Sequence, residues 1–445
     1  MKIINYYLYL FTLCSLPFYM IFRYSIFYGS GLWMYPGFII IYLFFITVVK
    51  YSKSKLYYPN SSLIIVMKII FCYYFFLCFQ AALLGSDLQG IIRRFWQHII
   101  PLMFFFISVD QLKNRKNINK ALKIVGTLSV IISIVFISEW YTVNILQQSS
   151  FPWSLRMHSE GIIGDLYVSQ SGENSFESSR IRGFRLGGPL LTNQNTSLFI
   201  IFGLIYFSSN FIYKMEKSKV IYLIITFISL ILLFARTPII SLLIISFIVL
   251  KLLFNYKIKF KLILQLLSVL LIVILITLSV KPDLFTNIIF YYSIYSMVIN
   301  PEGIIYAISS QFVEYLQFLI ENPFYIMNGV GFGYWSGSGQ FYSSSDFGIL
   351  YFHNMIGTLG FILIGIILFK LFIKIKFLLN NYFIGTEYYR YILISTIYIG
   401  TCILSTIHYT PMFHLANYCV FYMLLSILIN IFSIHGLQVI TEKKY

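Results

Sequence analysis

The feature that most constrains this chain is a series of apolar segments, most of them close to 20 residues long. About 20 residues of α-helix are needed to cross the hydrocarbon core of a membrane. Only 11% of the residues are charged, whereas soluble domains average about 25%. We therefore predict an all-α integral membrane protein that folds as a single polytopic membrane domain over residues 1–445. About twelve transmembrane helices are expected, near residues 4–22, 31–49, 61–84, 95–109, 121–143, 189–211, 220–235, 237–254, 262–280, 351–373, 391–409 and 415–434.

The basic residues in the loops set the expected orientation. The loops on one side, together with both termini, carry 22 lysines and arginines, whereas the loops on the other side carry nine. Because cytoplasmic loops are enriched in lysine and arginine, both termini are expected in the cytoplasm. Two long loops, 144–188 and 281–350, are then external, and the larger one lies between the ninth and tenth spans.

The type of basic residue also differs between the two sides. Twenty of the 22 cations on the expected cytoplasmic side are lysines, but eight of the nine on the external side are arginines. The orientation rule selects positive charge and does not separate lysine from arginine. Planar guanidinium groups bind phosphate oxygens in pairs. We therefore predict that Arg180, Arg182, Arg185 and Arg236 bind an anion, phosphate above all; anchoring to lipid headgroups is the alternative.

Several other classes of site are excluded by what the sequence lacks. The net charge of +17 resides in the loops and forms no separate basic face, so no nucleic-acid partner is expected. The chain has no HExxH motif and no His/Cys cluster, and we predict neither a metal site nor a cofactor. The segment GVGFG at 329–333 resembles half of a phosphate loop. Because it lacks the preceding strand and the following Gly-Lys-Ser/Thr, its glycines are expected to let the backbone fold tightly instead.

The order of several short motifs resembles that of the O-antigen polymerase and ligase superfamily of bacterial envelopes. The matching pieces are Arg182-Gly183, Asn193-x-Asn195, Ala235-Arg236-Thr237, Asn322-Pro323, GVGFG at 329–333, Asp346-Phe347-Gly348, and His353-Asn354 followed by the glycines at 357, 360 and 365. They cover about residues 180 to 370. The number of spans and the place of the large loop agree as well. Each motif is short, so their order carries the resemblance.

The resemblance implies a metal-independent membrane glycosyltransferase in the bacterial inner (cytoplasmic) membrane, with its active site on the periplasmic face. The implied donor and acceptor are glycans carried on undecaprenyl diphosphate. The external arginines would bind the diphosphate leaving group, and Arg236 is also expected to act in catalysis. His353 is the expected general base for the acceptor hydroxyl, and Asp346 is its rival. Membrane lipid and a chain-length regulator are the other implied partners.

Polymerases and ligases of this superfamily differ in the acceptor. Ligases carry a His-Asn-like motif followed by glycines at a set distance, and Gly365 falls one position beyond that spacing. This departure favours a polymerase that joins repeat units of an O-antigen or a related surface polysaccharide. A ligase that transfers the finished glycan to lipid A-core is the alternative. A repeat-unit flippase fits less well, because transporters place polar groups at the bilayer midplane.

Overall fold

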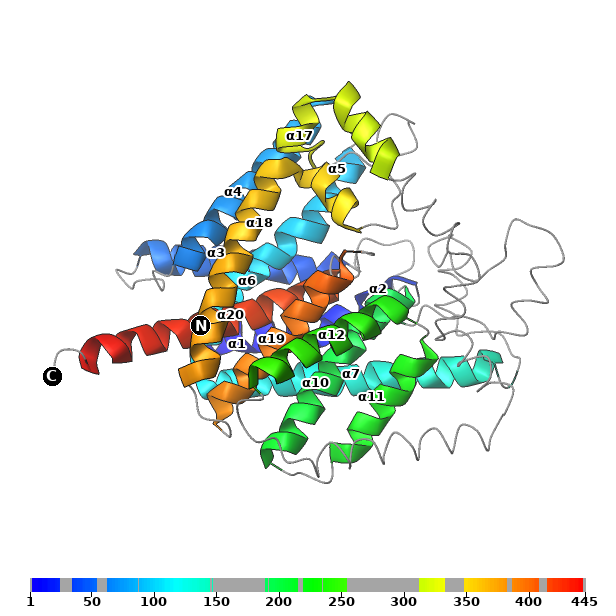
Figure 1. Ribbon diagram of the computed structural model, residues 1–445, viewed down its shortest axis with the longest axis vertical. Helices are drawn as coiled ribbons and strands as arrows, with labels where there is room; N and C mark the ends of the chain where they lie inside the picture. Colours follow the sequence, from blue (N-terminus) through cyan, green and yellow to red (C-terminus); the bar gives the residue numbers. More distant parts are fainter. Residues whose placement is uncertain are drawn as a thin grey trace. The chain divides into compact units, whose positions relative to one another are not determined.

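The computed structural model describes residues 2–24, 34–53, 62–86, 88–144, 146, 189–190, 192–214, 219–233, 235–253, 312–332, 348–381, 386–407 and 414–442. Within these ranges helices are the only regular secondary structure (Figure 1). They are α1 (Lys2–Ser15), η1 (Leu16–Phe18), α2 (Tyr19–Tyr24), α3 (Tyr35–Lys53), α4 (Ser62–Leu83), α5 (Leu88–Arg94), the π-helical turn η3 (Phe95–Ile99), α6 (Ile100–Gln111), α7 (Arg115–Asn144), α10 (Asn193–Lys214), α11 (Val220–Leu232), α12 (Arg236–Leu253), α17 (Phe324–Asn328), α18 (Gly348–Asn381), α19 (Glu387–Ser405) and α20 (Leu415–Glu442). Residues 312–321 form a further helix.

The chain divides into two compact units. Unit 1 comprises Met1–Thr12, Tyr35–Ala121 and Glu302–Tyr445, and unit 2 comprises Leu13–Met34 and Leu122–Pro301.

Helix α6 is a deeply buried element of unit 1, with α3 and α20 packed against it. Its side chains from Ile100 to Val109 are all buried, and those of Phe104 and Phe105 have no exposed surface. A helix that is apolar on every side is stable where its surroundings are apolar, whether protein or lipid, and around α6 they are protein. The expected span at 95–109, although short, coincides with η3 and α6.

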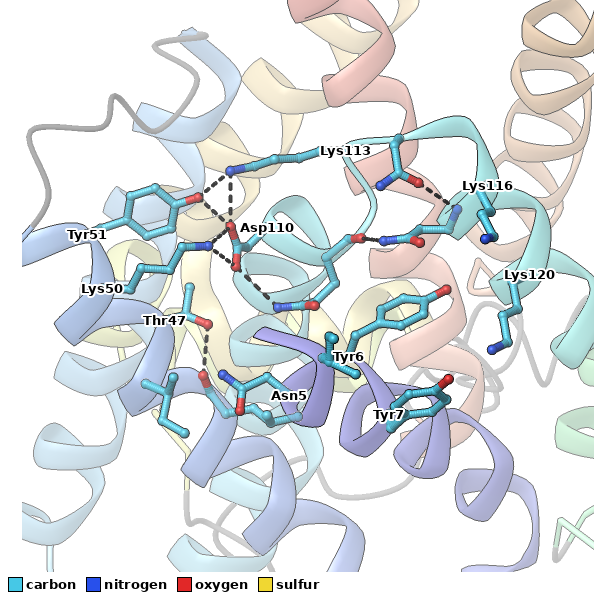
Figure 2. A pocket seen from close by; sticks show the side chains of 16 residues that line it. Asn5, Tyr6, Tyr7, Thr47, Lys50, Tyr51, Asp110, Lys113, Lys116 and Lys120 are labelled. Carbon is cyan, nitrogen blue, oxygen red and sulfur yellow. Dashed lines mark hydrogen bonds and ion pairs between the residues drawn. The ribbon is translucent and has the colours of Figure 1, made fainter. Parts of the chain in front are cut away.

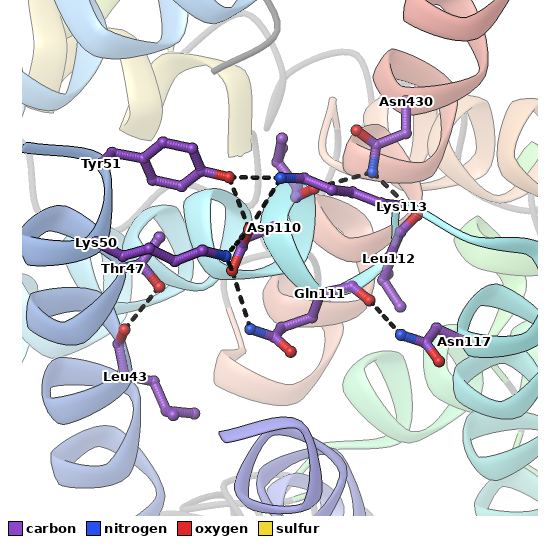
Figure 3. Close-up of polar contacts among 11 residues, drawn as sticks. Leu43, Thr47, Lys50, Tyr51, Asp110, Gln111, Leu112, Lys113, Asn117 and Asn430 are labelled. Atoms are coloured by element: carbon purple, nitrogen blue, oxygen red, sulfur yellow. Dashed lines mark hydrogen bonds and ion pairs between the residues drawn. The ribbon is translucent and has the colours of Figure 1, made fainter. Parts of the chain in front are cut away.

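Polar contacts fasten the C-terminal end of α6 (Figure 3). The Asp110 carboxylate accepts hydrogen bonds from Lys50 Nζ at 2.6 and 2.7 Å and from the Tyr51 hydroxyl at 2.6 Å. Lys113 Nζ lies 3.0 Å from the same carboxylate. From α20, Asn430 Nδ2 donates to two backbone carbonyl oxygens around the end of α6, at 3.0 and 3.1 Å. The end of this buried helix is therefore held by both α3 and α20.

Five of the described helices are long and apolar enough to cross a membrane. The five segments are Tyr35–Ser52, Ser62–Leu83, Arg115–Thr142, Gly348–Leu379 and Leu415–Ser433. Large apolar side chains project from several of them, and those of Phe45, Phe79 and Phe369 are 60%, 62% and 67% exposed. Apolar surface of this kind is unfavourable in water and stable in hydrocarbon. These helices indicate a helical, membrane-embedded protein.

The remaining expected spans also coincide with helices, apart from the one at 262–280, which lies outside the described residues. The total of about twelve spans stays a prediction. Most of the two expected external loops, 144–188 and 281–350, also falls outside the described residues. The part of the second loop that is described, residues 312–332, contains two short helices and the glycine-rich segment.

In unit 2, α10 packs against both α11 and α12. Small residues bring α10 close to α7, because a Cβ atom on Gly203 would collide with Ser129 and one on Gly126 would collide with Tyr206. Ser129 Oγ also donates a hydrogen bond to the carbonyl oxygen of Phe199 at 3.0 Å. Close backbone approach through small residues, with a hydrogen bond across the contact, is typical of helix packing in membranes.

Glu387, the first residue of α19, connects this helix to the start of α7 within unit 1. Its carboxylate pairs with Arg115 and accepts hydrogen bonds from Asn119 Nδ2 and the Tyr391 hydroxyl, both at 3.1 Å. The hydrogen bond from Arg115 is the main reason that the pKa of Glu387 falls from 4.5 to about 2, against the opposing effect of burial.

We expect Glu387 to make the fold sensitive to acid between pH 4.5 and about 2. A carboxyl group whose pKa is lower in the folded protein stabilises the fold above its unfolded pKa. This contribution is lost as the pH falls through the folded pKa. The melting temperature of the purified protein in detergent should therefore drop across this window, and Glu387→Gln should flatten the drop. An equal drop in both proteins would contradict this role for Glu387.

Candidate functional site

The candidate site is built around a break in helix α18. Gly357 interrupts this helix with φ 60° and ψ −177°, far from the α-helical values near −63° and −42°. A break of this kind leaves the carbonyl groups of the preceding turn without partners in their own helix. At membrane depth such groups must find other partners within the protein.

The glycine-rich loop that follows α17 supplies those partners. The backbone N–H groups of Val330 and Gly331 donate to the carbonyl oxygens of Asn354 and Met355, at 2.8 and 3.1 Å. The next carbonyl oxygen along α18 accepts from the Tyr73 hydroxyl of α4 at 2.6 Å. The break in α18 is therefore closed by backbone and side-chain donors from two other elements.

The same loop is also fastened to α4. The N–H group of Phe332 donates to the carbonyl oxygen of Leu77 at 3.1 Å, and Gln80 Nε2 donates to the carbonyl oxygen of Gly329 at 2.9 Å. The His98 ring of η3 stacks on the Phe332 ring, with 4.7 Å between centroids. The loop therefore lies between α4 and α18, with its Phe332 ring packed against His98. We call residues 329–332 the wedge.

Three glycines make this wedge possible. Gly329, Gly331 and Gly357 all have positive φ, between 60° and 85°, a region that residues with a Cβ atom rarely occupy. A Cβ atom on Gly329 would also collide with the backbone of α18, and one on Gly331 would lie 2.8 Å from the Leu77 carbonyl oxygen. These contacts confirm that Gly329 and Gly331 of GVGFG serve tight backbone packing, and Gly333 lies outside the described residues.

His353 lies one turn before the break, with both ring nitrogens in contact with hydroxyl groups. Its Nδ1 atom is hydrogen-bonded to the Tyr315 hydroxyl of helix 312–321. Its Nε2 atom lies 3.2 Å from Thr358 Oγ1, on the far side of Gly357. The Phe361 ring packs beside the imidazole, with 5.1 Å between centroids.

The hydrogen bonds of Thr358 determine which nitrogen of His353 carries the proton. Thr358 Oγ1 donates its only hydrogen to the carbonyl oxygen of Ile326 at 2.8 Å, so it acts as an acceptor toward the imidazole. A neutral imidazole has one donor and one acceptor nitrogen. Nε2 is therefore the protonated nitrogen, and Nδ1 offers its lone pair to Tyr315. The basic nitrogen of neutral His353 is therefore the one hydrogen-bonded to the Tyr315 hydroxyl.

A buried arginine lies beside the first turn of the same helix. Arg94, the last residue of α5, is 3% exposed, and its guanidinium carbon lies 5.2 Å from the centre of the Tyr351 ring. Its Nη1 atom donates to Gln97 Oε1 at 2.8 Å. Tyr351 precedes His353 by two residues, and residues two apart do not face each other on a helix, so this contact places Arg94 beside Tyr351 at the start of α18.

Two of the segments that carry the family resemblance meet within unit 2. Asn193 Nδ2, at the start of α10, donates to the carbonyl oxygen of Leu233 at 3.1 Å. Leu233 directly follows α11, three residues before Arg236, which begins α12. The side chain of Arg236 lies outside the described residues, but the hydrogen bond places the entry of α10 next to the turn that carries it.

The structure describes only part of the site that the sequence predicts. Arg180, Arg182, Arg185 and Asp346 lie outside the described residues, so their roles stay predictions. Tyr315 and Thr358, which contact the His353 ring, and Arg94, which lies over the Tyr351 ring, were not predicted from the sequence. Arg94 belongs to the arginine-rich side of the chain, and that enrichment could have identified it. Tyr315 and Thr358 carry no distinguishing signal, because each is one of many similar residues in an apolar chain.

Comparison of the chain with known protein families, with curated proteins and with solved structures finds no match.

Proposed function

We propose that the protein polymerises lipid-linked oligosaccharide repeat units, as O-antigen polymerases do. The growing glycan would be transferred from undecaprenyl diphosphate to a sugar hydroxyl of another lipid-linked repeat unit. The observation that best supports this proposal is the state of His353. Its unprotonated Nδ1 atom is held against a hydroxyl group, the arrangement that a general base needs toward an acceptor hydroxyl.

In the proposed reaction, the acceptor hydroxyl gives its proton to His353 Nδ1, either directly or through the Tyr315 hydroxyl. The acceptor oxygen forms a bond to the anomeric carbon of the donor glycan, and the bond from that carbon to the diphosphate oxygen breaks. The lipid diphosphate leaves with the electron pair. Arginine side chains stabilise the negative charge that develops on it. We assign this role to Arg180, Arg182, Arg185 and Arg236.

Replacing Arg236 by lysine should lower polymer formation almost as much as replacing it by alanine. Lysine keeps the positive charge but loses the fork of paired donors that fits phosphate oxygens. The measurement is polymer formed per unit of protein in membranes, with immunoblots to show that each variant is present. Full activity of Arg236→Lys would show that this residue acts only through its charge or only as an anchor to lipid headgroups.

We also propose that both termini lie in the cytoplasm and that the loops 144–188 and 281–350 face the periplasm of a bacterial inner membrane. Reporter fusions at Ser171 and Ser338 should then show export, and fusions at the C-terminus should not. A cytoplasmic signal at either serine would overturn the orientation. It would also contradict the proposed position of the active site on the periplasmic face.

The proposed function is tested by the glycolipids of a strain that lacks the protein. A single repeat unit on the lipid core is expected, because transfer to the core continues without polymerisation. Complete polymer stranded on the carrier lipid would instead indicate a ligase that uses lipid A-core as acceptor. Loss of both products would indicate a repeat-unit flippase.

A further inference from the structure

A second polar site lies at the other end of α6 from His98, in unit 1. It is a cavity of about 740 Å³ between the start of α1, the end of α3, the end of α6 and the start of α7 (Figure 2). From His98 to Asp110 the chain continues through the π turn and α6 for twelve residues, which corresponds to about 18 Å of helix. The cavity is therefore separate from the proposed catalytic site.

The polar wall of the cavity has an excess of positive charge. Its charged lining residues are four lysines, Lys50, Lys113, Lys116 and Lys120, and one carboxylate, Asp110. The Asp110 carboxylate already pairs with Lys50 and Lys113, which consumes the only negative charge among these residues. The positive charge of the cavity therefore comes from Lys116 and Lys120.

Neither of these two lysines has an acidic partner among the described residues. Lys116 and Lys120 are both exposed and lie one helical turn apart on α7, so they present their charges on one face. Lys120 Nζ lies over the rings of Tyr6 and Tyr7, 5.7 and 5.1 Å from their centres. These aromatic rings leave its charge available to an incoming anion. Figure 2 shows Lys120 near Tyr6 and Tyr7, with Lys116 also at the cavity.

The cavity also has an apolar wall, formed by Ile3, Leu43 and Ile46. Two of these side chains belong to α3, whose candidate span ends at Ser52. Lys50 is therefore in the last turn of a segment that is long and apolar enough to cross a membrane. The ends of such segments lie at the depth of the lipid headgroups, where phosphates meet basic side chains.

We propose that this cavity binds the phosphate of an anionic phospholipid headgroup, with Lys116 and Lys120 as its charged contacts and the apolar wall against the glycerol and upper acyl chains. The site is independent of the proposed glycan transfer. A specific lipid would then bind at the end of α6 and the start of α7, in addition to the bilayer that surrounds every membrane protein.

The test measures lipid binding to the purified full-length protein by native mass spectrometry. The protein in detergent is titrated with phosphatidylglycerol, which is anionic, and with phosphatidylcholine, which carries a phosphate but no net charge. Lys116→Gln and Lys120→Gln should each weaken phosphatidylglycerol binding about fivefold, the effect of about 1 kcal/mol per basic residue near an anionic membrane surface. The double variant should weaken it more than either single variant, because both charges face the same phosphate.

The matched control is Lys123→Gln. Lys123 is an exposed lysine of the same helix, three residues after Lys120, and it does not line the cavity. It removes the same charge and should leave binding unchanged. All variants should keep the melting temperature of the unmodified protein, because none of the three lysines takes part in the ion pairs of Asp110. Measured melting temperatures then show that each variant is folded.

Three results would overturn the proposal. The first is equal binding of phosphatidylglycerol to the Lys116→Gln/Lys120→Gln variant and to the Lys123→Gln control. The second is equal binding of phosphatidylcholine and phosphatidylglycerol to the unmodified protein. The third is lysine-dependent binding of inorganic phosphate in the absence of any lysine-dependent lipid binding, which would assign the cavity to a free anion.

Discussion

Replacing His353 by alanine should lower the rate of polymer formation by about 10²–10⁴-fold, the usual contribution of a positioned base. The expected cause is loss of the Nδ1 acceptor, which is the basic nitrogen in the neutral tautomer that the hydrogen bonds of Thr358 select. Binding of the lipid-linked donor should remain, because the arginines are unchanged. The measurement is polymer formed in membranes from a defined lipid-linked repeat unit, together with donor retention on the purified protein.

Tyr315→Phe distinguishes the two routes that the proton could take to His353. This variant keeps the buried ring, which packs against Phe318. It removes only the hydroxyl group that is hydrogen-bonded to His353 Nδ1. A loss as large as that of His353→Ala would show that the Tyr315 hydroxyl relays the proton. Retained activity would show that the substrate hydroxyl displaces it. Normal polymerisation by His353→Ala combined with inactive Asp346→Asn would assign the base to Asp346 instead.

Replacing Gly357 by alanine should abolish polymer formation and lower the melting temperature. The backbone conformation at Gly357 is one that only glycine adopts readily, and forcing it on another residue costs about 1–3 kcal/mol. The new Cβ atom would also collide with the backbone of Gly329 and the carbonyl oxygen of Met327, which cannot rotate away. Residues 329–332 would have to move away from α18. Their hydrogen bonds to the carbonyl oxygens of Asn354 and Met355 would then be lost, and each loss would lower the free energy of unfolding by about 1 kcal/mol.

Gly365→Ala is the matched control within the same helix. No atom lies within 4 Å of the position that a Cβ atom on Gly365 would take, and α18 has helical backbone angles there. Alanine is the better helix former by about 1 kcal/mol, so this variant should keep full activity and an equal or higher melting temperature. If Gly357→Ala behaved like Gly365→Ala, the break would not be needed for the site.

The class of the protein and the positions of its helices follow largely from the sequence. Apolar segments about 20 residues long leave the chain few choices other than helices in a membrane, because only internal hydrogen bonds satisfy the backbone there. The segment at 95–109 is short for a membrane span. It forms η3 and α6, and its side chains from His98 to Val109 are all buried. The sequence also predicted the structural role of the glycines in GVGFG, since a phosphate loop would need flanking elements that are absent.

The environment of the site was decided by tertiary structure alone. The break at Gly357 is closed by donors from residues as distant in the chain as Tyr73, 283 positions before its partner Ile356. The protonation state of His353 depends on Thr358, which is oriented by a carbonyl oxygen 32 positions earlier. Local periodicity and motif spacing report on neighbours within a few residues of the chain, so they carry no information about such pairings. The same reason explains why Arg94 was counted in the sequence as one more external cation, whereas the fold places it beside Tyr351 at the start of α18.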